Sequence, residues 1–172
     1  MTINAMTRLK ILLVEDDPDR RARIEDLISS ITDTFELEVI VSYEEVLKEI
    51  GLNNHDAYLV SKEFSDNRGL EIIWEISGQG CRGPALVLAN DDDPELESEA
   101  VNLGAMIYLV RDQLSSRFLE RMIRHAIDRK RYEDNIRDNQ EDLIKRMMDL
   151  QDSSERFEAQ SVEYVQMAED LA

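Results

Sequence analysis

The sequence predicts an α/β protein, a doubly wound five-stranded parallel sheet of the form (βα)5, followed by one long C-terminal helix. Three observations lead to this expectation. Short apolar runs alternate with amphipathic stretches through the first two-thirds of the 172 residues, a pattern typical of a parallel sheet covered on both faces. Residues 115–172 contain no Gly or Pro, which predicts unbroken helix. That same segment carries an apolar residue at every seventh position, which indicates a coiled coil.

Five short segments rich in apolar residues are the predicted strands. Each is short, rich in Leu, Ile, Val or Ala, and followed by a polar residue. A short continuous apolar run with polar boundaries is consistent with a strand that is buried on both faces. The predicted strands are residues 9–14, 35–41, 57–60, 85–89 and 106–110.

Helices are predicted between these strands from apolar spacing and from end signals. Ile24, Leu27, Ile28 and Ile31 recur at helical spacing after the first strand. An Asp before a Pro is a favourable N-cap followed by a first-turn proline, and two such pairs occur. The predicted signals are Asp17-Pro18 for the first helix, Gly51 closing the second, Gly69 opening the third, Asp93-Pro94 and Gly104 bounding the fourth, and Leu114 opening the last.

The tail repeat predicts self-association. Its main column is apolar throughout, and a companion column three residues earlier, to which Met147 belongs, is half polar. The main column consists of Ile136, Leu143, Leu150, Phe157, Tyr164 and Leu171. A helix of about 80 Å, at 1.5 Å per residue, is too long to fold back on a small domain, so we expect a homodimer. We favour parallel pairing, although the repeat is also compatible with antiparallel pairing. The expected division is a tail at 1–8, a domain at 9–130 and a coiled-coil helix at 131–172.

Composition excludes several classes of function. The 38 Asp and Glu against 20 Lys and Arg give a net charge of −18, which disfavours a nucleic-acid partner. No apolar run is long enough for a membrane span, and residues 1–8 lack the apolar stretch of a signal peptide. One cysteine, Cys81, excludes an internal disulfide framework. We therefore expect a cytoplasmic protein with no membrane partner.

Polar residues that follow the strands are the candidate site, since ligands of such sheets bind beyond the carboxyl ends of the strands. Glu15 and Asp16 follow the first strand directly. Two adjacent carboxylates repel each other unless a cation lies between them, and Arg111, after the fifth strand, is the expected cation. The competing interpretation is that these acids only solvate a loop and cap a helix.

Three segments resemble the receiver domain of response regulators in two-component signalling. They are residues 9–18 (LKILLVEDDP), 55–70 (HDAYLVSKEFSDNRGL) and 100–114, which contains Gly104-Ala105 and YLVRD. They occur in the order and spacing of that family, and the resemblance covers about residues 7–130. It implies a flavodoxin-like receiver fold.

The resemblance also assigns roles to individual positions. Receivers hold Mg²⁺ with two acidic residues after the first strand, which are matched here by Glu15 and Asp16. Their phosphate-accepting Asp lies eight residues before a loop glycine, a position that Ser61 occupies. Their hydroxyl residue after the fourth strand is replaced by Ala89, and their Lys after the fifth strand by Arg111. The aromatic switch residue is matched by Tyr108.

These replacements predict a degenerate receiver that takes no phosphate on the usual residue. A serine hydroxyl, unlike a carboxylate, needs a general base to act as a nucleophile. Arg111 is expected to bridge Glu15 and Asp16, and Mg²⁺ is expected to bind weakly, so we expect no cofactor. The predicted function is a non-enzymatic signalling module that relays protein–protein interactions without phosphorylation. We expect a protein partner at the face formed by the fourth helix, the fifth strand and the helix after it.

Three alternatives stay open at this point. The domain could be a phosphoreceiver with another acceptor, such as Asp56 or Asp66, with Ser61 as a less favoured kinase substrate. The chain could be the N-terminal regulatory fragment of a sensor histidine kinase or a diguanylate cyclase, because its repeat continues to Leu171. The altered pocket could also bind a small ligand.

Overall fold

The computed structural model describes residues 8–31 and 34–170 and contains the predicted five strands. Leu171, the last member of the predicted apolar column, and most of the predicted N-terminal tail lie outside the described residues. The strands are β1 (Leu9–Val14), β2 (Phe35–Ile40), β3 (Ala57–Ser61), β4 (Ala85–Ala89) and β5 (Ala105–Val110). The helices are α1 (Pro18–Ser29), α2 (Tyr43–Leu52), α3 (Phe64–Asn67), α4 (Gly69–Gly78), α5 (Pro94–Asn102), the short 3₁₀ helix η1 (Arg111–Gln113) and α6 (Ser116–Asp170).

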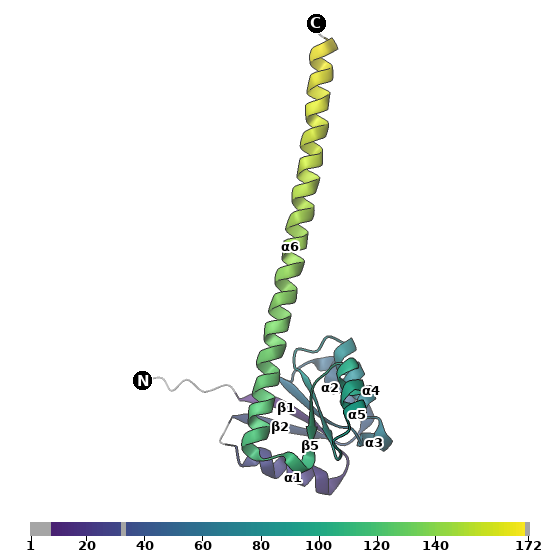
Figure 1. The fold of residues 1–172 in the computed structure, drawn as a ribbon, viewed down its shortest axis with the longest axis vertical. Helices are drawn as coiled ribbons and strands as arrows, with labels where there is room; N and C mark the ends of the chain where they lie inside the picture. Colours follow the sequence, from purple (N-terminus) through teal and green to yellow (C-terminus); the bar gives the residue numbers. More distant parts are fainter. Residues whose placement is uncertain (1–7, 32–33, 171–172) are drawn as a thin grey trace, which may run out of the picture. The chain divides into compact units, whose positions relative to one another are not determined.

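The strands form one sheet in the order β2-β1-β3-β4-β5, and every neighbouring pair is parallel. Side chains alternate between the two faces of the strands. Leu12, Val14, Tyr58 and Val60 face α2, α4 and α5, while Ile11, Leu13, Ala57 and Leu59 face α1 and the first turns of α6 (Figure 1). The doubly wound α/β fold is therefore confirmed, and it brings the residues that follow β1, β3, β4 and β5 to one edge of the sheet.

The predicted caps are confirmed. The side chain of Asp17 accepts hydrogen bonds from the backbone N–H groups of Asp19 and Arg20, and Asp93 accepts from Glu95 and Leu96. These carboxylates satisfy N–H groups that have no partner inside the helix. The bonds from Arg20 and Asp19 also lower the pKa of Asp17, although partial desolvation opposes them.

Several boundaries differ from the prediction. Gly51 lies inside α2, which ends at Leu52 because Asn53 takes the left-handed conformation (φ 52°) that terminates a helix. The polar segment after β3, predicted as a loop, contains the short helical turn α3, in which Ser65 and Asp66 have positive φ angles. β2 ends at Ile40 and α6 begins at Ser116, so both predicted boundaries were off by one or two residues.

The chain divides into two compact units, Met1–Lys130 and Arg131–Ala172. The first fifteen residues of α6 belong to the first unit, and its remainder makes up the second. Side chains of the predicted stripe in the second unit are 40–72% exposed: Ile136, Leu143, Met147, Leu150, Phe157 and Tyr164. Among the described residues, no helix combines the length and the apolar character needed to cross a bilayer.

Candidate functional site

Arg111 lies at the centre of a buried polar cluster at the carboxyl edge of the sheet. It begins η1 directly after β5, and only 3% of it is exposed. Its Nη1 atom donates to Glu63 Oε2 and to Asn90 Oδ1, both at 2.7 Å. Its Nη2 atom donates to Glu15 Oε2 at 2.9 Å and to Ser61 Oγ at 2.6 Å. The guanidinium, which follows β5, therefore joins residues at or after the ends of three other strands, β1, β3 and β4. We name these five residues, Arg111, Glu15, Ser61, Glu63 and Asn90, the arginine pocket.

Glu15 is fully buried between two guanidinium groups. Arg20, one turn into α1, places Nε 3.2 Å from both carboxylate oxygens and Nη2 3.0 Å from Oε1, while Arg111 contacts Oε2. Burial lowers the pKa of Arg20, but the hydrogen bond and charge of Glu15 outweigh it, so this pKa is raised. A buried carboxylate needs such pairing, because an unpaired charge away from water is strongly unfavourable.

Asp16 does not pair with Arg111 in the described structure, so the expectation that Arg111 holds both acids is wrong for this residue. Its Oδ2 atom accepts a hydrogen bond from the Ser65 backbone N–H at 2.9 Å, and Oδ1 lies 3.8 Å from Arg20 Nη2. Consecutive residues that leave a strand point in opposite directions. Glu15 therefore points into the pocket, while the Asp16 side chain is 37% exposed.

Glu63 supplies the second carboxylate of the pocket, a role that the sequence did not reveal. It accepts from Arg111 at 2.7 Å, from the Ser61 hydroxyl at 3.3 Å and from the Asn90 backbone N–H at 3.4 Å. Burial raises the pKa of Glu63, but the hydrogen bond and the charge of Arg111 lower it further, so the pKa lies below its usual value. Glu63 therefore takes the place on Arg111 that was expected for Asp16.

Asn90, a pocket residue, and Arg20, which pairs with Glu15, were not predicted as site residues, although the sequence contained a signal for each. Arg20 follows Glu15 by five residues, after a helix start that turns the chain back over β1. Asn90 is the first polar residue after β4. Asn90 lies at the carboxyl end of a strand, the position that selected Arg111, whereas Arg20 lies in the first turn of the helix that follows β1.

The remaining predicted site residues occupy the expected positions. Ser61 is the last residue of β3 and Ala89 the last of β4, and both are buried. The Tyr108 hydroxyl donates to the Asp91 backbone carbonyl at 2.8 Å, which ties this side chain to the loop after β4. Burial, followed by the nearby carboxylates of Asp93 and Glu63, raises the Tyr108 pKa.

The two alternative acceptors lie outside the pocket. Asp56 precedes β3, at the opposite end of that strand from Ser61, where it accepts from the Lys10 N–H and from Arg82 at 2.8 Å. Asp66 is an exposed residue of α3. The structure therefore gives neither of them the contacts that surround Ser61.

The comparisons with known proteins agree on the fold. Residues 11–124 match the family model described as the response regulator receiver domain. A comparison with the curated proteins found no significant match.

Solved structures that resemble this chain include several receiver domains. A CheY-like receiver from Methanospirillum hungatei is 19% identical with a TM-score of 0.61, over 74% of this chain and 99% of that one. The receiver of a modulated diguanylate cyclase from Desulfovibrio desulfuricans is 23% identical with a TM-score of 0.61, over 73% and 98%. The receiver of sensor histidine kinase PA1611 from Pseudomonas aeruginosa, with magnesium coordinated in its active site cleft, is 21% identical with a TM-score of 0.61, over 71% and 99%.

Proposed function

Because the chain belongs to the response-regulator receiver family, we propose that it is a pseudo-receiver, a two-component signalling module that works without phosphorylation of its own. It has no catalytic activity in this proposal. Its receiver-like part, residues 9–130, binds a protein partner, and its helix at 131–172 joins two copies. The arginine pocket is the observation that carries this proposal.

The contacts of Arg111 support the loss of phosphotransfer. Its guanidinium bonds to Ser61 Oγ, at the position where the family has its acceptor carboxylate, and to Glu15 Oε2. A serine hydroxyl needs a general base to become a nucleophile, and a guanidinium, which is always protonated, cannot supply one. Glu63 receives a hydrogen bond from this hydroxyl, but its charge is already shared with Arg111. The pocket therefore stabilises an ion pair rather than a nucleophile.

The same residues fit Mg²⁺ poorly. This ion needs near-octahedral oxygen ligands and is usually held by carboxylates together with phosphate. Both oxygens of Glu15 are engaged by guanidinium groups, and one oxygen of Asp16 accepts a backbone N–H. Two buried or half-buried cations also repel a divalent ion. We therefore assign no step of the function to Mg²⁺.

Treatment with a small phosphodonor tests this proposal. With acetyl phosphate and Mg²⁺ the chain is expected to keep its intact mass, and with beryllium fluoride and Mg²⁺ it is expected to give no bound-fluoride signal in ¹⁹F NMR. A conventional receiver treated in parallel shows that the reagents are active. A stable adduct on any residue, Asp56 and Asp66 included, would contradict the proposal, and peptide mapping would identify the acceptor.

The exposed stripe of the second unit supports pairing between two copies. Ile136, Leu143 and Leu150 repeat every seven residues, as does the coiled-coil seam, and all are exposed in the single chain. Leaving such a column in water is unfavourable by about 25 cal/mol per Å² of apolar surface. Burial against the same helix of a second copy removes this cost. The half-polar companion column predicts a dimer of moderate stability.

Paired substitutions on two faces of the helix test the dimer. Leu143→Ser with Leu150→Ser is expected to convert a dimer to a monomer in sedimentation-velocity experiments at micromolar concentration, because both changes remove apolar contacts of the seam. Lys145→Ser with Asp152→Ser places the same two serines away from the seam and is expected to leave the dimer intact. A parent chain that sediments as a monomer, or equal behaviour of the two variants, would rule out this pairing.

A further inference from the structure

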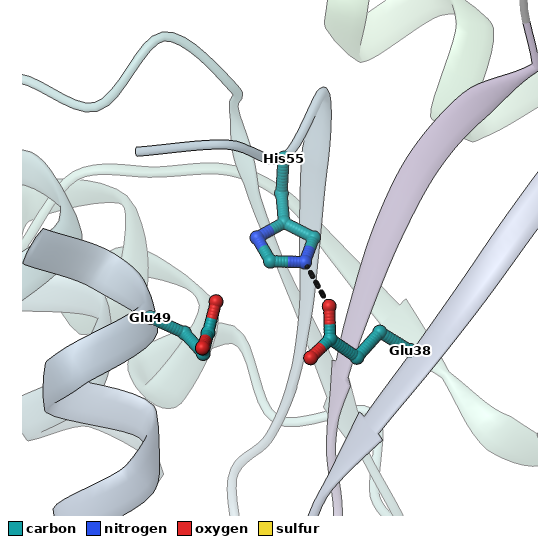
Figure 2. A group of neighbouring side chains, drawn as sticks. All are labelled: Glu38, Glu49 and His55. Carbon is teal, nitrogen blue, oxygen red and sulfur yellow. Dashed lines mark hydrogen bonds and ion pairs between the residues drawn. The ribbon is translucent and has the colours of Figure 1, made fainter. Parts of the chain in front are cut away.

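Glu38, Glu49 and His55 form a second cluster of polar side chains, separate from the arginine pocket. Glu38 comes from β2, Glu49 from α2 and His55 from the segment before β3. One ligand-type atom from each residue lies within 4.8 Å of the other two. Figure 2 shows the imidazole ring and the two carboxylates directed toward one another from these three elements. Because His55 precedes β3 and Ser61 ends it, the cluster and the pocket lie toward opposite ends of that strand.

The burial of His55 is the second, independent observation. Only 2% of this side chain is exposed. Its Nε2 atom lies 2.8 Å from Glu38 Oε2, but within the described part of the chain its Nδ1 atom has no hydrogen-bond partner. Buried polar atoms are nearly always satisfied, and each exception needs an explanation. The hydrogen bond to Glu38 satisfies Nε2 and leaves the buried Nδ1 atom without an explanation.

We propose that Glu38, Glu49 and His55 bind one divalent transition-metal ion, with Zn²⁺ as the ion best suited to them. One imidazole nitrogen and two carboxylate oxygens are a donor set that Zn²⁺ takes readily, at distances of about 2.0–2.2 Å, and three protein ligands leave a fourth position for water. Two carboxylates balance the charge of the ion. Neutral imidazole binds metals through either ring nitrogen, and one nitrogen of His55 lies within 4.8 Å of a carboxylate oxygen of Glu38 and of Glu49.

The architecture allows the ion to enter and to hold the three elements together. The Glu38 side chain is about half exposed, at 53%, and lies on the edge strand of the sheet, so an ion from solvent can reach its carboxylate. Glu49 is partly buried on α2, whose apolar residues Val46 and Ile50 pack into the core. The donors need only small side-chain movements, since tetrahedral ligands at these bond lengths lie about 3.3–3.5 Å apart. The site therefore links β2, α2 and the start of β3.

Zn²⁺ titration of the full chain tests this site. After treatment with a chelator, calorimetry is expected to show one tightly bound Zn²⁺ ion per chain. Glu38→Gln and Glu49→Gln are expected to weaken this binding by about tenfold or more, because each loses one carboxylate ligand, while both side chains keep their size. Glu36→Gln, on an exposed neighbouring position of β2, removes the same charge and is expected to retain the parent affinity.

His55→Gln provides the third ligand test, with circular dichroism as the check of folding because His55 is buried. X-ray absorption at the zinc edge is expected to show imidazole scattering in the parent chain, which reports the histidine without any substitution. The proposal is overturned if the parent binds no Zn²⁺, if Glu36→Gln weakens binding as much as Glu38→Gln and Glu49→Gln do, or if the bound ion shows no imidazole ligand.

Discussion

Replacing Arg111 with alanine is expected to lower the free energy of unfolding by about 3 kcal/mol, the largest effect on stability that we predict. The substitution removes four hydrogen bonds from a group that is almost fully buried. Glu15 keeps Arg20 as a partner, which places the loss at the lower end of the range for breaking a buried ion pair. Urea unfolding followed by the fluorescence of Trp74, the chain's one tryptophan, measures the change.

Arg82→Ala is the matched control for this experiment. Its ion pair with Asp56 has a comparable length, 2.8 Å, but Arg82 is 70% exposed, so its loss is expected to lower the free energy of unfolding by less than about 1 kcal/mol. Arg111→Lys is expected to lie between the two, because a single ammonium group keeps the charge but cannot reach four acceptors in the same geometry. Equal losses of unfolding free energy in Arg111→Ala and Arg82→Ala would show that the buried ion pairs of the pocket stabilise the fold no more than an exposed ion pair does.

Restoring the family's residues is expected to produce the largest change in chemistry. The triple variant Ser61→Asp, Ala89→Thr, Arg111→Lys should form a Mg²⁺-dependent acyl phosphate with acetyl phosphate, whereas the parent should form none. Aspartate at position 61 is ionised at neutral pH and needs no base, and lysine removes the guanidinium group that occupies Glu15 Oε2 and Ser61 Oγ. Intact-mass measurement before and after hydroxylamine treatment identifies the acyl phosphate.

The corresponding variant with Ser61→Asn separates nucleophilic attack from simple opening of the pocket. It carries the other two substitutions and a side chain of similar size, but it has no carboxylate, so it is expected to stay unmodified. If the triple variant itself stays unmodified while remaining folded, Arg111 is not the main obstacle. Arg20, which contacts both oxygens of Glu15, would then be the residue that keeps the site closed.

The fold could be predicted almost completely from the sequence, because its determinants are local. The apolar segments predicted all five strands. Asp17 and Asp93 predicted where two helices begin, because each caps backbone N–H groups in the first turn of the helix that follows it. The helical turn α3 could not be predicted, since it depends on left-handed conformations at Ser65, Asp66 and Asn67. One contact that holds it is the hydrogen bond between the Ser65 N–H and Asp16, which only the tertiary structure brings together.

The sequence predicted where in the fold the candidate site lies, but not which side chains pair with one another there. The strand-end rule located Glu15 and Arg111, the resemblance to receivers located Ser61, and the structure brings the three into contact. The sequence could not show which second carboxylate pairs with Arg111 beside Glu15, because this depends on the direction in which each side chain points. Asp16 follows a buried residue and turns toward solvent, whereas the loop after β3 brings Glu63 back over the pocket. The pairing predicted between Arg111 and Asp16 was therefore wrong.

The position of β2 at the outer edge of the sheet has a consequence for the behaviour of the protein in solution. An edge strand offers unpaired backbone N–H and C=O groups on which another sheet can grow. Here Glu36 and Glu38 alternate along β2, and both are exposed. Two β2 edges carry like charges and repel each other, which disfavours pairing between the β2 strands of two molecules.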